Sequence, residues 1–171
     1  MHKCPMRSVH SALIIIHYSL KMISIRPGTR PDIPQAFDLV TELAVYEKAA
    51  DQVSNTADQM AEDGFGPTPL FGVLVAEDSD GQKIVGIALY YFRYSTWKGK
   101  RLYLEDIVVT EAFRGYGIGK LLLDATIEMA KETGCTGMMW QVLDWNEPAI
   151  GFYQQFGTRF DNGWTNCHLD F

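Results

Sequence analysis

The sequence has few of the residues that build metal sites or disulfide frameworks. Its three cysteines, Cys4, Cys135 and Cys167, lie far apart and form no CxxC pair, which argues against a disulfide framework and favours a reducing cytoplasm. The four histidines form no ligand pair at helical or hairpin spacing, and three of them precede residue 18. We therefore predict no metal site.

Long apolar runs are also missing. Residues 12–16 are apolar, but His17 and Tyr18 interrupt the run well short of a membrane span, and no convincing signal-peptide cleavage site precedes Lys21. We expect residues 1–21 to be an N-terminal extension, either non-native or flexible, ahead of a single domain at residues 22–171. If the extension is ordered, residues 13–16 should add a strand or contact a partner subunit.

Positive charge is scarce outside the extension. The chain has 15 basic and 21 acidic residues, and three of the basic ones fall in the acid-free first 21 residues, so the remainder carries 12 basic against 21 acidic residues. Such a surface repels nucleic acid and favours cationic ligands such as polyamines and lysine-like amines. We expect no nucleic-acid partner and no membrane partner.

Three of the 15 glycines, in contrast, fall within five residues of one motif. Arg114-Gly115-Tyr116-Gly117-Ile118-Gly119 follows a strand-like segment at residues 102–109 and precedes a helix-like one, an arrangement that presents backbone N–H groups to a phosphate. The dinucleotide fingerprint fails because Lys120 stands where its third glycine should be, and the Walker A pattern fails because Leu121 supplies no hydroxyl. The alternative is a glycine-rich turn without a ligand, which would lower stability for no evident purpose.

Apolar periodicity and turn residues predict the order of the secondary structure. We expect strands over residues 23–27, 70–77, 83–94, 101–109, 137–143, 158–160 and 164–171, and helices over residues 32–48, 56–63, 120–131 and 147–156. Thr56 and Asn146 are expected helix N-caps, and Gly64, Gly134 and Gly157 are expected helix ends. The fold class is α/β (an α+β mixed sheet), with about seven strands flanked by about four helices.

The motif and several short sequence segments around it resemble those of the GNAT superfamily of N-acetyltransferases, and within it those of the diamine acetyltransferases. The resemblance runs from residue 23 to about residue 164 and is carried by residues 46–48, 62–66, 90–92, 94–99, 103–106, 114–119, 144–148 and 152–153. Residues 95–99 and 143–146 look closer to the thialysine branch, whereas Tyr46 and residues 146–148 look closer to the spermidine/spermine branch. The resemblance implies a GNAT-like fold with a central twisted mixed sheet and an N-acetyltransferase that uses acetyl-CoA and no metal.

It also implies which residues hold acetyl-CoA. The backbone of Ile107, Val108 and Val109 would pair with the pantetheine arm, and the thioester would lie where residues 101–109 splay away from the parallel strand 137–143. The simpler interpretation of residues 107–109 is a core strand. The residues expected to wrap the pyrophosphate or complete the cofactor site are Arg114, Gly115, Tyr116, Gly117, Ile118, Gly119, Lys120, Asn146 and Ala149.

The expected catalytic residues are Tyr153 and Glu105. A phenol with a pKa near 10 is protonated at neutral pH and can protonate the departing thiolate, although Tyr153 could also be a core tyrosine. An amine with a pKa of about 10.4 is neutral in roughly one molecule per thousand at pH 7, so a base must take its proton. Glu105 is the preferred base, with a solvated strand carboxylate as the alternative. Asp106 is expected on the other face unless a β-bulge intervenes.

The resemblance implies an acidic and aromatic site for the substrate amine. Tyr46 and Glu47 match positions that hold the distal amine, by ion pairing and cation-π contact, unless they are an ordinary helix end. Glu105, Asp106 and Asp144 complete the expected substrate set. Trp145 and Trp97 could add to it, and Trp140 is expected in the core.

Two departures from the family affect the partner and the substrate. The chain ends at Phe171, where the family continues into a tail that reaches the partner subunit, and residues 165–166 lack the usual basic or aromatic pattern. We nevertheless expect a homodimer. A protein or peptide acceptor is the alternative within the enzyme class, and a non-catalytic acyl-CoA sensor is the alternative outside it.

Overall fold

The computed structural model describes residues 14–18, 21–80 and 82–169, and it divides into two compact units, Met1–Trp140 and Gln141–Phe171. The first unit is a mixed sheet with three α-helices, and the second contains one α-helix. No helix in the described part of the chain is long and apolar enough to cross a membrane.

The sheet of the first unit contains six strands in the order β1-β2-β3-β4-β5-β6. All neighbours are antiparallel except β5 and β6, which are parallel, so the expected mixed sheet is confirmed with six strands rather than about seven. The strands are β1 Ile14–Tyr18, β2 Lys21–Pro27, β3 Gly72–Asp78, β4 Lys83–Ser95, β5 Gly99–Val109 and β6 Met138–Met139. The helices of this unit are α1 Ile33–Tyr46, α2 Ala57–Phe65 and α3 Ile118–Glu132, with 3-10 turns at Arg30–Asp32, Ala50–Gln52 and Glu111–Phe113.

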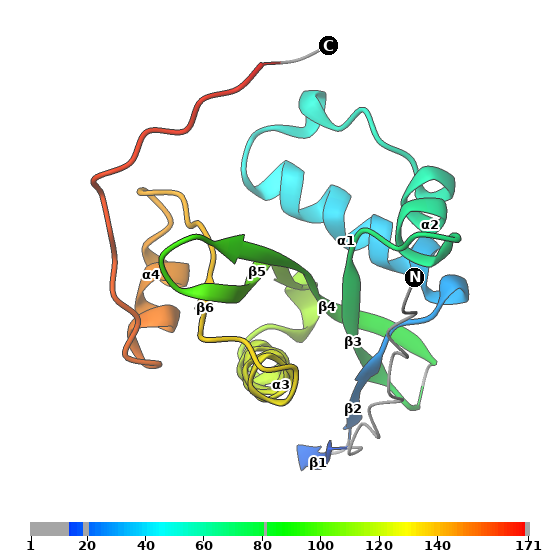
Figure 1. Ribbon diagram of the computed structural model, residues 1–171. Helices are drawn as coiled ribbons and strands as arrows, with labels where there is room; N and C mark the ends of the chain where they lie inside the picture. The colour runs from blue at the N-terminus through cyan, green and yellow to red at the C-terminus, as the bar shows by residue number, and fades with distance from the viewer. Residues whose placement is uncertain (1–13, 19–20, 81, 170–171) are drawn as a thin grey trace. The chain divides into compact units, whose positions relative to one another are not determined.

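The helices cover the two faces of the sheet. In Figure 1, α1 and α2 lie on one side of the strands and α3 lies on the other. The core on the α1 side is built from one apolar side of that helix and alternate residues of the strands, because successive strand residues point to opposite faces. Its buried members are Ile33, Ala36, Leu39, Met60, Val73, Val75, Ile84, Ile87 and Val108.

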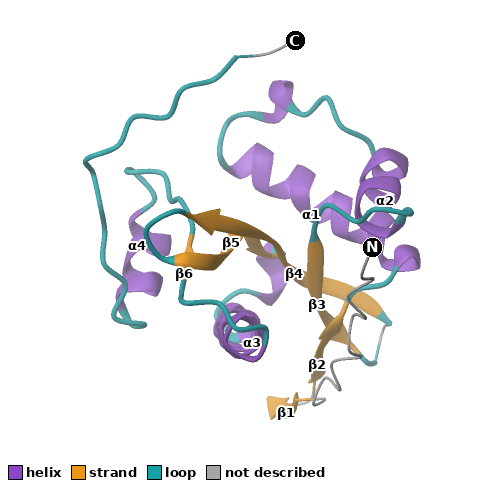
Figure 2. Cartoon of the chain, in the orientation of Figure 1, coloured by secondary structure: helices purple, strands orange, loops and turns teal. Residues whose placement is uncertain are grey.

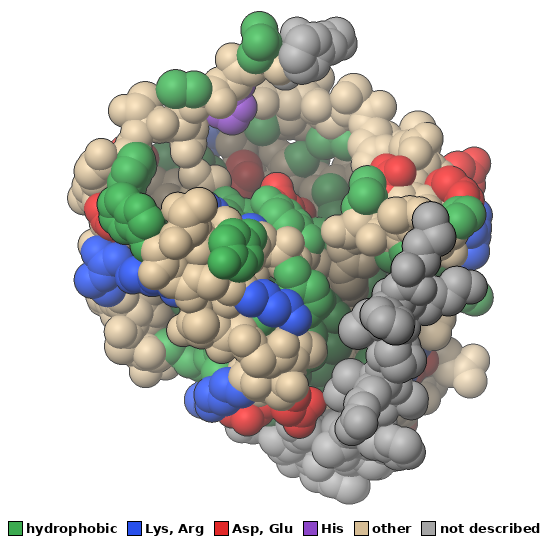
Figure 3. Space-filling model, viewed as in Figure 1, with side chains coloured by type: hydrophobic (Ala, Val, Ile, Leu, Met, Phe, Trp, Pro, Cys, Tyr) green, Lys and Arg blue, Asp and Glu red, His purple; other side chains and the backbone are tan. Residues whose placement is uncertain are grey.

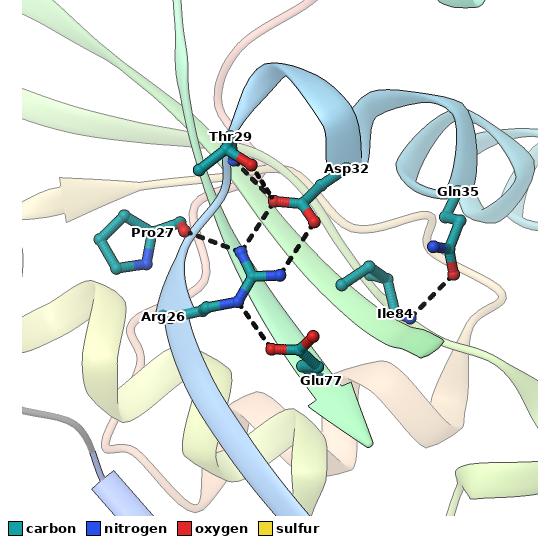
Figure 4. Close-up of polar contacts among 7 residues, drawn as sticks. All are labelled: Arg26, Pro27, Thr29, Asp32, Gln35, Glu77 and Ile84. Atoms are coloured by element: carbon teal, nitrogen blue, oxygen red, sulfur yellow. Dashed lines mark hydrogen bonds and ion pairs between the residues drawn. The ribbon is translucent and has the colours of Figure 1, made fainter. Parts of the chain in front are cut away.

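An ion-pair network fixes the start of α1 against the sheet (Figure 4). The Arg26 guanidinium donates to both carboxylate oxygens of Asp32, at 2.7 and 2.9 Å, and its Nε donates to Glu77 at 2.8 Å. The backbone and hydroxyl of Thr29 also donate to Asp32. The Arg26 hydrogen bonds are the main reason that the pKa of Asp32 falls to about 2.

Several expected boundaries are confirmed. Thr56 caps α2 by accepting from the backbone N–H of Gln59, and Gly134 follows α3 with a left-handed φ of 75°. The strand conditionally expected at residues 13–16 is present as β1, although Leu13 lies outside the described residues. Residues 1–13 of the extension are likewise outside them.

Gly64 does not end α2, contrary to expectation. The helix continues to Phe65 and its C-cap is Gly66. A Cβ on Gly64 would lie 2.6 Å from Cζ of Phe71, so this glycine lets an aromatic ring pack against the helix. The glycine therefore serves a tertiary contact that the local sequence did not reveal.

The C-terminal part of the sheet was also predicted wrongly. The strand expected at residues 137–143 is limited to Met138–Met139, and the hairpin expected at residues 158–160 and 164–171 forms no strand at residues 158–169. Figure 2 shows the chain after α4 as a loop. Trp164 and Leu169 are exposed, so the alternating pattern here buries no apolar face among the described residues.

Candidate active site

The glycine motif forms a tight turn into α3. Gly115 and Gly117 have φ values of 81° and 77°, a left-handed conformation that side chains disfavour, and Gly117 is the N-cap of the helix. Ile118 is buried and anchors the turn in the core. The intrahelical ladder begins at Leu121, whose N–H donates to the Gly117 carbonyl, so the first-turn N–H groups precede the ladder. A Cβ on Gly115 would meet no atom within 4 Å, which leaves space beside the turn.

Arg114 links this turn to β5 and α1. Its Nε donates to the Val109 carbonyl at 2.8 Å, and its Nη2 lies 3.3 Å from a carboxylate oxygen of Glu42. The same Glu42 oxygen accepts from the backbone N–H of Glu111 at 2.9 Å. The guanidinium carbon also lies 5.4 Å from the centre of the Tyr46 ring.

One edge of β5 is only partly covered by β6. Pairing between the two strands involves Leu102 with Met138 and Tyr103 with Met139. The N–H and C=O groups of successive strand residues point alternately to the two edges of the strand. The N–H of Thr110 donates to the Val85 carbonyl of β4, so Thr110 points its backbone groups towards β4. Ile107 and Val109 therefore point their N–H and C=O groups away from β4. Val108 is buried on the α1 side of the sheet. Of the three residues predicted to contact pantetheine, Val108 thus supplies a core side chain. Ile107 and Val109 supply backbone groups at an edge where a ligand can bind.

A β-bulge in β5 changes the expected position of Asp106. Leu89 pairs with Asp106 and Tyr90 pairs with Leu104, so Glu105 is the extra residue. Asp106 and Leu89 line a cavity on the α1 side of the sheet. Tyr91 is two residues from Leu89 in β4 and so points to the same face, and Glu105 interacts with Tyr91. Asp106 was expected on the other face unless a β-bulge intervened. The bulge is present, and it turns both carboxylates to one face.

The two carboxylates have different surroundings. Burial, followed by the charges of Glu105 and Glu47, raises the pKa of Asp106 to about 6. Glu105 is exposed to solvent. Burial, then the charge of Glu105 and a hydrogen bond to it, raises the pKa of Tyr91 to about 12, and the Tyr91 and Tyr103 rings stack with centroids 5.1 Å apart. Sequence reasoning missed both tyrosines, because only the register across β4 and β5 brings them to Glu105.

The cavity beside Asp106 has a volume of about 260 Å³ and a mainly apolar lining. Asp106 and Asp63 supply its carboxylates. The remaining lining residues are Phe37, Val40, Val53, Asn55, Met60, Leu70, Phe71 and Leu89. Figure 3 shows acidic side chains over α2, which carries Asp58 and Glu62 in addition to Asp63. The cavity suits a small molecule that combines a hydrocarbon part with a positive charge.

Tyr46 and Glu47 lie at the C-terminal end of α1. Tyr46 is its last residue, and Glu47 is its C-cap and donates its backbone N–H to the Leu43 carbonyl. Burial raises the pKa of Glu47, and its charge contributes to the raised pKa of Asp106. Within the first unit, the predicted substrate residues Glu47, Glu105 and Asp106 are therefore close enough to interact electrostatically.

The predicted site residues Asp144, Asn146, Ala149 and Tyr153 lie in the second unit. Its helix, α4 Glu147–Gln154, begins at Asn146, whose side chain accepts from the backbone N–H of Ala149 at 3.3 Å. Tyr153 is buried at 6% exposure, and its ring centroid lies 5.3 Å from that of Phe152. Asp144 is exposed in the turn before the helix.

The tryptophans give a mixed result. Trp145 and Trp97 are exposed, the latter at 85%. Trp140, expected inside a core strand, lies outside β6 and is only half-buried, because the β6 ladder ends at Met139. The described residues contain no group of three or more His, Cys, Asp or Glu side chains that could hold a metal ion.

Comparison with known proteins decides the family. A profile described as the Acetyltransferase (GNAT) family matches residues 37–158. The chain belongs to the GNAT acetyltransferase family. The mixed sheet and its parallel β5 and β6 pair agree with the fold that the resemblance implied.

Individual relatives agree with this assignment. The chain is 40% identical over 146 residues to thialysine N-epsilon-acetyltransferase of Bos taurus, which covers 82% of this chain and 86% of the relative. It is also 40% identical over 154 residues to spermidine/spermine N(1)-acetyltransferase-like protein 1 of Homo sapiens, covering 85% of this chain and 22% of that one. As a GNAT member with such relatives, this protein is an N-acetyltransferase.

A solved structure supports the fold. An aminoglycoside N-acetyltransferase in complex with CoA superimposes with a TM-score of 0.71 at 17% identity, over 90% of this chain and 99% of the other. At this identity the likeness concerns the GNAT fold alone. The roles of the individual site residues stay predictions that rest on the geometry above.

Proposed function

We propose that this GNAT protein transfers an acetyl group from acetyl-CoA to a primary amine of a small polyamine or lysine-like molecule, by direct attack in a ternary complex. The observation that carries the proposal is the bulge in β5, which turns Glu105 and Asp106 to one face beside an acidic, mainly apolar cavity. A cationic amine with a hydrocarbon chain complements this environment. Relatives named for thialysine and for spermidine/spermine acetylation support the same substrate class.

The residues of the glycine turn fit the donor. Gly115 and Gly117 adopt left-handed conformations, and the space beside Gly115 lets an anion approach the backbone at the start of α3. In this proposal Arg114, Tyr116, Ile118, Gly119 and Lys120 complete the pyrophosphate site. Ile107 and Val109 offer strand-edge groups to the pantetheine arm. Asn146 and Ala149 of the second unit stay predicted donor contacts.

The donor supplies an activated acetyl thioester, and the protein supplies orientation and proton transfer. Glu47, Glu105 and Asp106 attract the acceptor as an ammonium ion, and Glu105 or Asp106 accepts its proton, directly or through water. The neutral amine then forms the new N–C bond to the acetyl carbonyl carbon while the C–S bond breaks. The nitrogen releases its second proton to solvent, which leaves a neutral amide, and solvent later returns a proton to Tyr153. Tyr153 donates its phenolic proton to the departing thiolate.

Two other features are part of the proposal. Residues 22–171 act as a single N-acetyltransferase domain, since the family match at residues 37–158 runs through both compact units. A cytoplasmic location and a homodimer also stay predictions, and sedimentation analysis tests the second.

An amine panel tests the proposed function. Release of coenzyme A is measured with acetyl-CoA and spermidine, thialysine, lysine or a lysine-containing peptide as acceptor. Turnover with spermidine or thialysine supports the proposal, and turnover confined to the peptide favours a protein acceptor. Acetyl-CoA binding without turnover on any acceptor favours a sensor.

Tyr153→Phe tests the proton donor within the same assay. The substitution keeps the buried ring and removes the hydroxyl, so kcat should fall by roughly 10²-fold or more while the Kd for coenzyme A stays within about twofold. An unchanged kcat would remove Tyr153 from the mechanism.

A further inference from the structure

Arg114 connects two regions to which the proposed function assigns different ligands. The turn that contains Arg114 is proposed to bind the donor pyrophosphate, whereas Tyr46 and Glu47 at the end of α1 are proposed to hold the acceptor amine. Arg114 contacts α1 through the Glu42 carboxylate at 3.3 Å and through the Tyr46 ring at 5.4 Å. Glu42 and Tyr46 are four residues apart on one helix, so they lie on the same side of α1, one turn apart.

The contact between Arg114 and Glu42 contributes little to the free energy of unfolding. The two side chains retain 41% and 33% exposure, and ion pairs of this kind contribute about 0–1 kcal/mol. Glu42 nevertheless has a defined position, because the same oxygen accepts from the Glu111 backbone N–H in the turn that precedes Arg114. Glu42 thus fastens both the backbone and the guanidinium of the donor region to α1.

The Arg114 guanidinium still has donors available for an anion. Arginine has five N–H donors, and the contacts with Val109 and Glu42 use two of them. A pyrophosphate at the glycine turn can therefore pair with Arg114 without first breaking these contacts. Pairing would neutralise a positive charge that lies over the Tyr46 ring.

This charge bears directly on the amine. A cation over an aromatic ring is attracted by the ring's electron density, and a second cation close to the same ring is repelled by the first. Before the donor binds, Glu42 offsets part of the Arg114 charge, and the remaining positive charge opposes an ammonium ion at Tyr46 and Glu47. After the donor binds, the phosphate charge removes that opposition.

We infer that Glu42 and Tyr46 hold Arg114 as a coupling element, through which an anion at the glycine turn raises the affinity of the acceptor corner for its amine. This inference rests on the proposed function and adds a positioning role for Glu42. It predicts positive cooperativity between donor and amine, and by linkage the amine raises the affinity for the donor by the same factor. Because Arg114 is partly exposed, we expect the factor to be near the low end for coupled sites, about fivefold.

Calorimetric titration tests the inference without turnover. The Kd of spermidine and of thialysine is measured with and without saturating coenzyme A, and the ratio of the two values is the coupling factor. Wild-type protein should give about fivefold tighter amine binding with coenzyme A, and the factor should fall in about 1 M salt because exposed charges are then screened.

Three variants and a control separate coupling from simple loss of binding. Tyr46→Leu removes the ring and Glu42→Ala releases Arg114, so each should bring the factor below about twofold, whatever it does to amine affinity itself. Tyr46→Phe keeps the ring and should keep the factor. Glu128→Ala removes a different exposed ion pair, with Lys131 of α3, and should behave as wild type. Circular dichroism confirms that each variant is folded.

The outcomes distinguish this inference from the function on which it rests. Coenzyme A that binds wild-type protein with no effect on amine affinity overturns the coupling and leaves the proposed function standing. An undiminished factor in both Glu42→Ala and Tyr46→Leu overturns the coupling as well. Failure of wild-type protein to bind coenzyme A overturns the proposed donor and the coupling together.

Discussion

Replacing Asp106 with asparagine should stabilise the protein at neutral pH while impairing acetyl transfer. Burial first, and then the charges of Glu105 and Glu47, raise the pKa of Asp106 from 3.8 to about 6. A carboxyl whose pKa is higher in the folded state than in the unfolded state binds its proton more tightly when folded. Asp106 therefore does not change the free energy of unfolding below about pH 4. Between about pH 4 and 6 it lowers this free energy progressively, and above about pH 6 the loss is at its maximum.

The size of this cost follows from the shift. A difference of about two pKa units at 1.36 kcal/mol per unit gives about 3 kcal/mol above pH 6. Asparagine has nearly the same shape and no charge, so Asp106→Asn should recover much of this, about 1–3 kcal/mol. For a chain of this size such a gain corresponds to a melting temperature higher by roughly 2–10 °C.

Urea unfolding measured from pH 4 to pH 8 tests this reasoning. The advantage of Asp106→Asn should be small at pH 4 and reach its maximum near pH 7, whereas kcat/KM for the amine should fall by roughly tenfold or more through loss of ammonium binding. Asp38→Asn on the exposed side of α1 is a matched control and should change stability by less than about 0.5 kcal/mol. A variant no more stable than wild type at pH 7, with an unchanged pH dependence, would refute the assigned burial of Asp106.

Two further predictions concern other parts of the first unit. Asp32→Asn should cost about 2 kcal/mol at pH 7, because the Arg26 hydrogen bonds lower the pKa of Asp32 from 3.8 to about 2. This contribution is present above about pH 4 and is lost as the pH falls towards 2, so the two urea midpoints should converge in acid, and a constant gap would contradict the prediction. Gly117→Ala should destabilise the protein by about 1–2 kcal/mol, because a residue with Cβ is placed at a φ of 77°, and should weaken coenzyme A binding measured by calorimetry. Wild-type stability and affinity in this variant would show that the glycine is not needed there.

The sequence alone determined the parts of this protein that depend on local chemistry. Thr56 caps α2, Asn146 caps α4 and Gly134 follows α3, because each of these roles depends on one side chain, or on its absence, next to its own backbone. The glycine turn was predicted for the same reason, since positive φ values and a following helix are encoded within six residues. Short sequence segments that the chain shares with the GNAT family were enough to indicate that family, and the comparisons confirmed it.

Only the tertiary structure decided the features that depend on distant partners. Gly64 is needed for the ring of Phe71, and residues 158–169 form no strand because an alternating pattern needs an apolar layer to cover it. The register between β4 and β5 leaves Glu105 as an extra residue, and that shift turns Asp106 to the face of Glu105. Strand alternation predicts opposite faces, and nothing in the local sequence signals the bulge. The contact of Glu42 and Tyr46 with Arg114 likewise joins residues about 70 positions apart, which only the packing of α1 against the end of β5 can bring together.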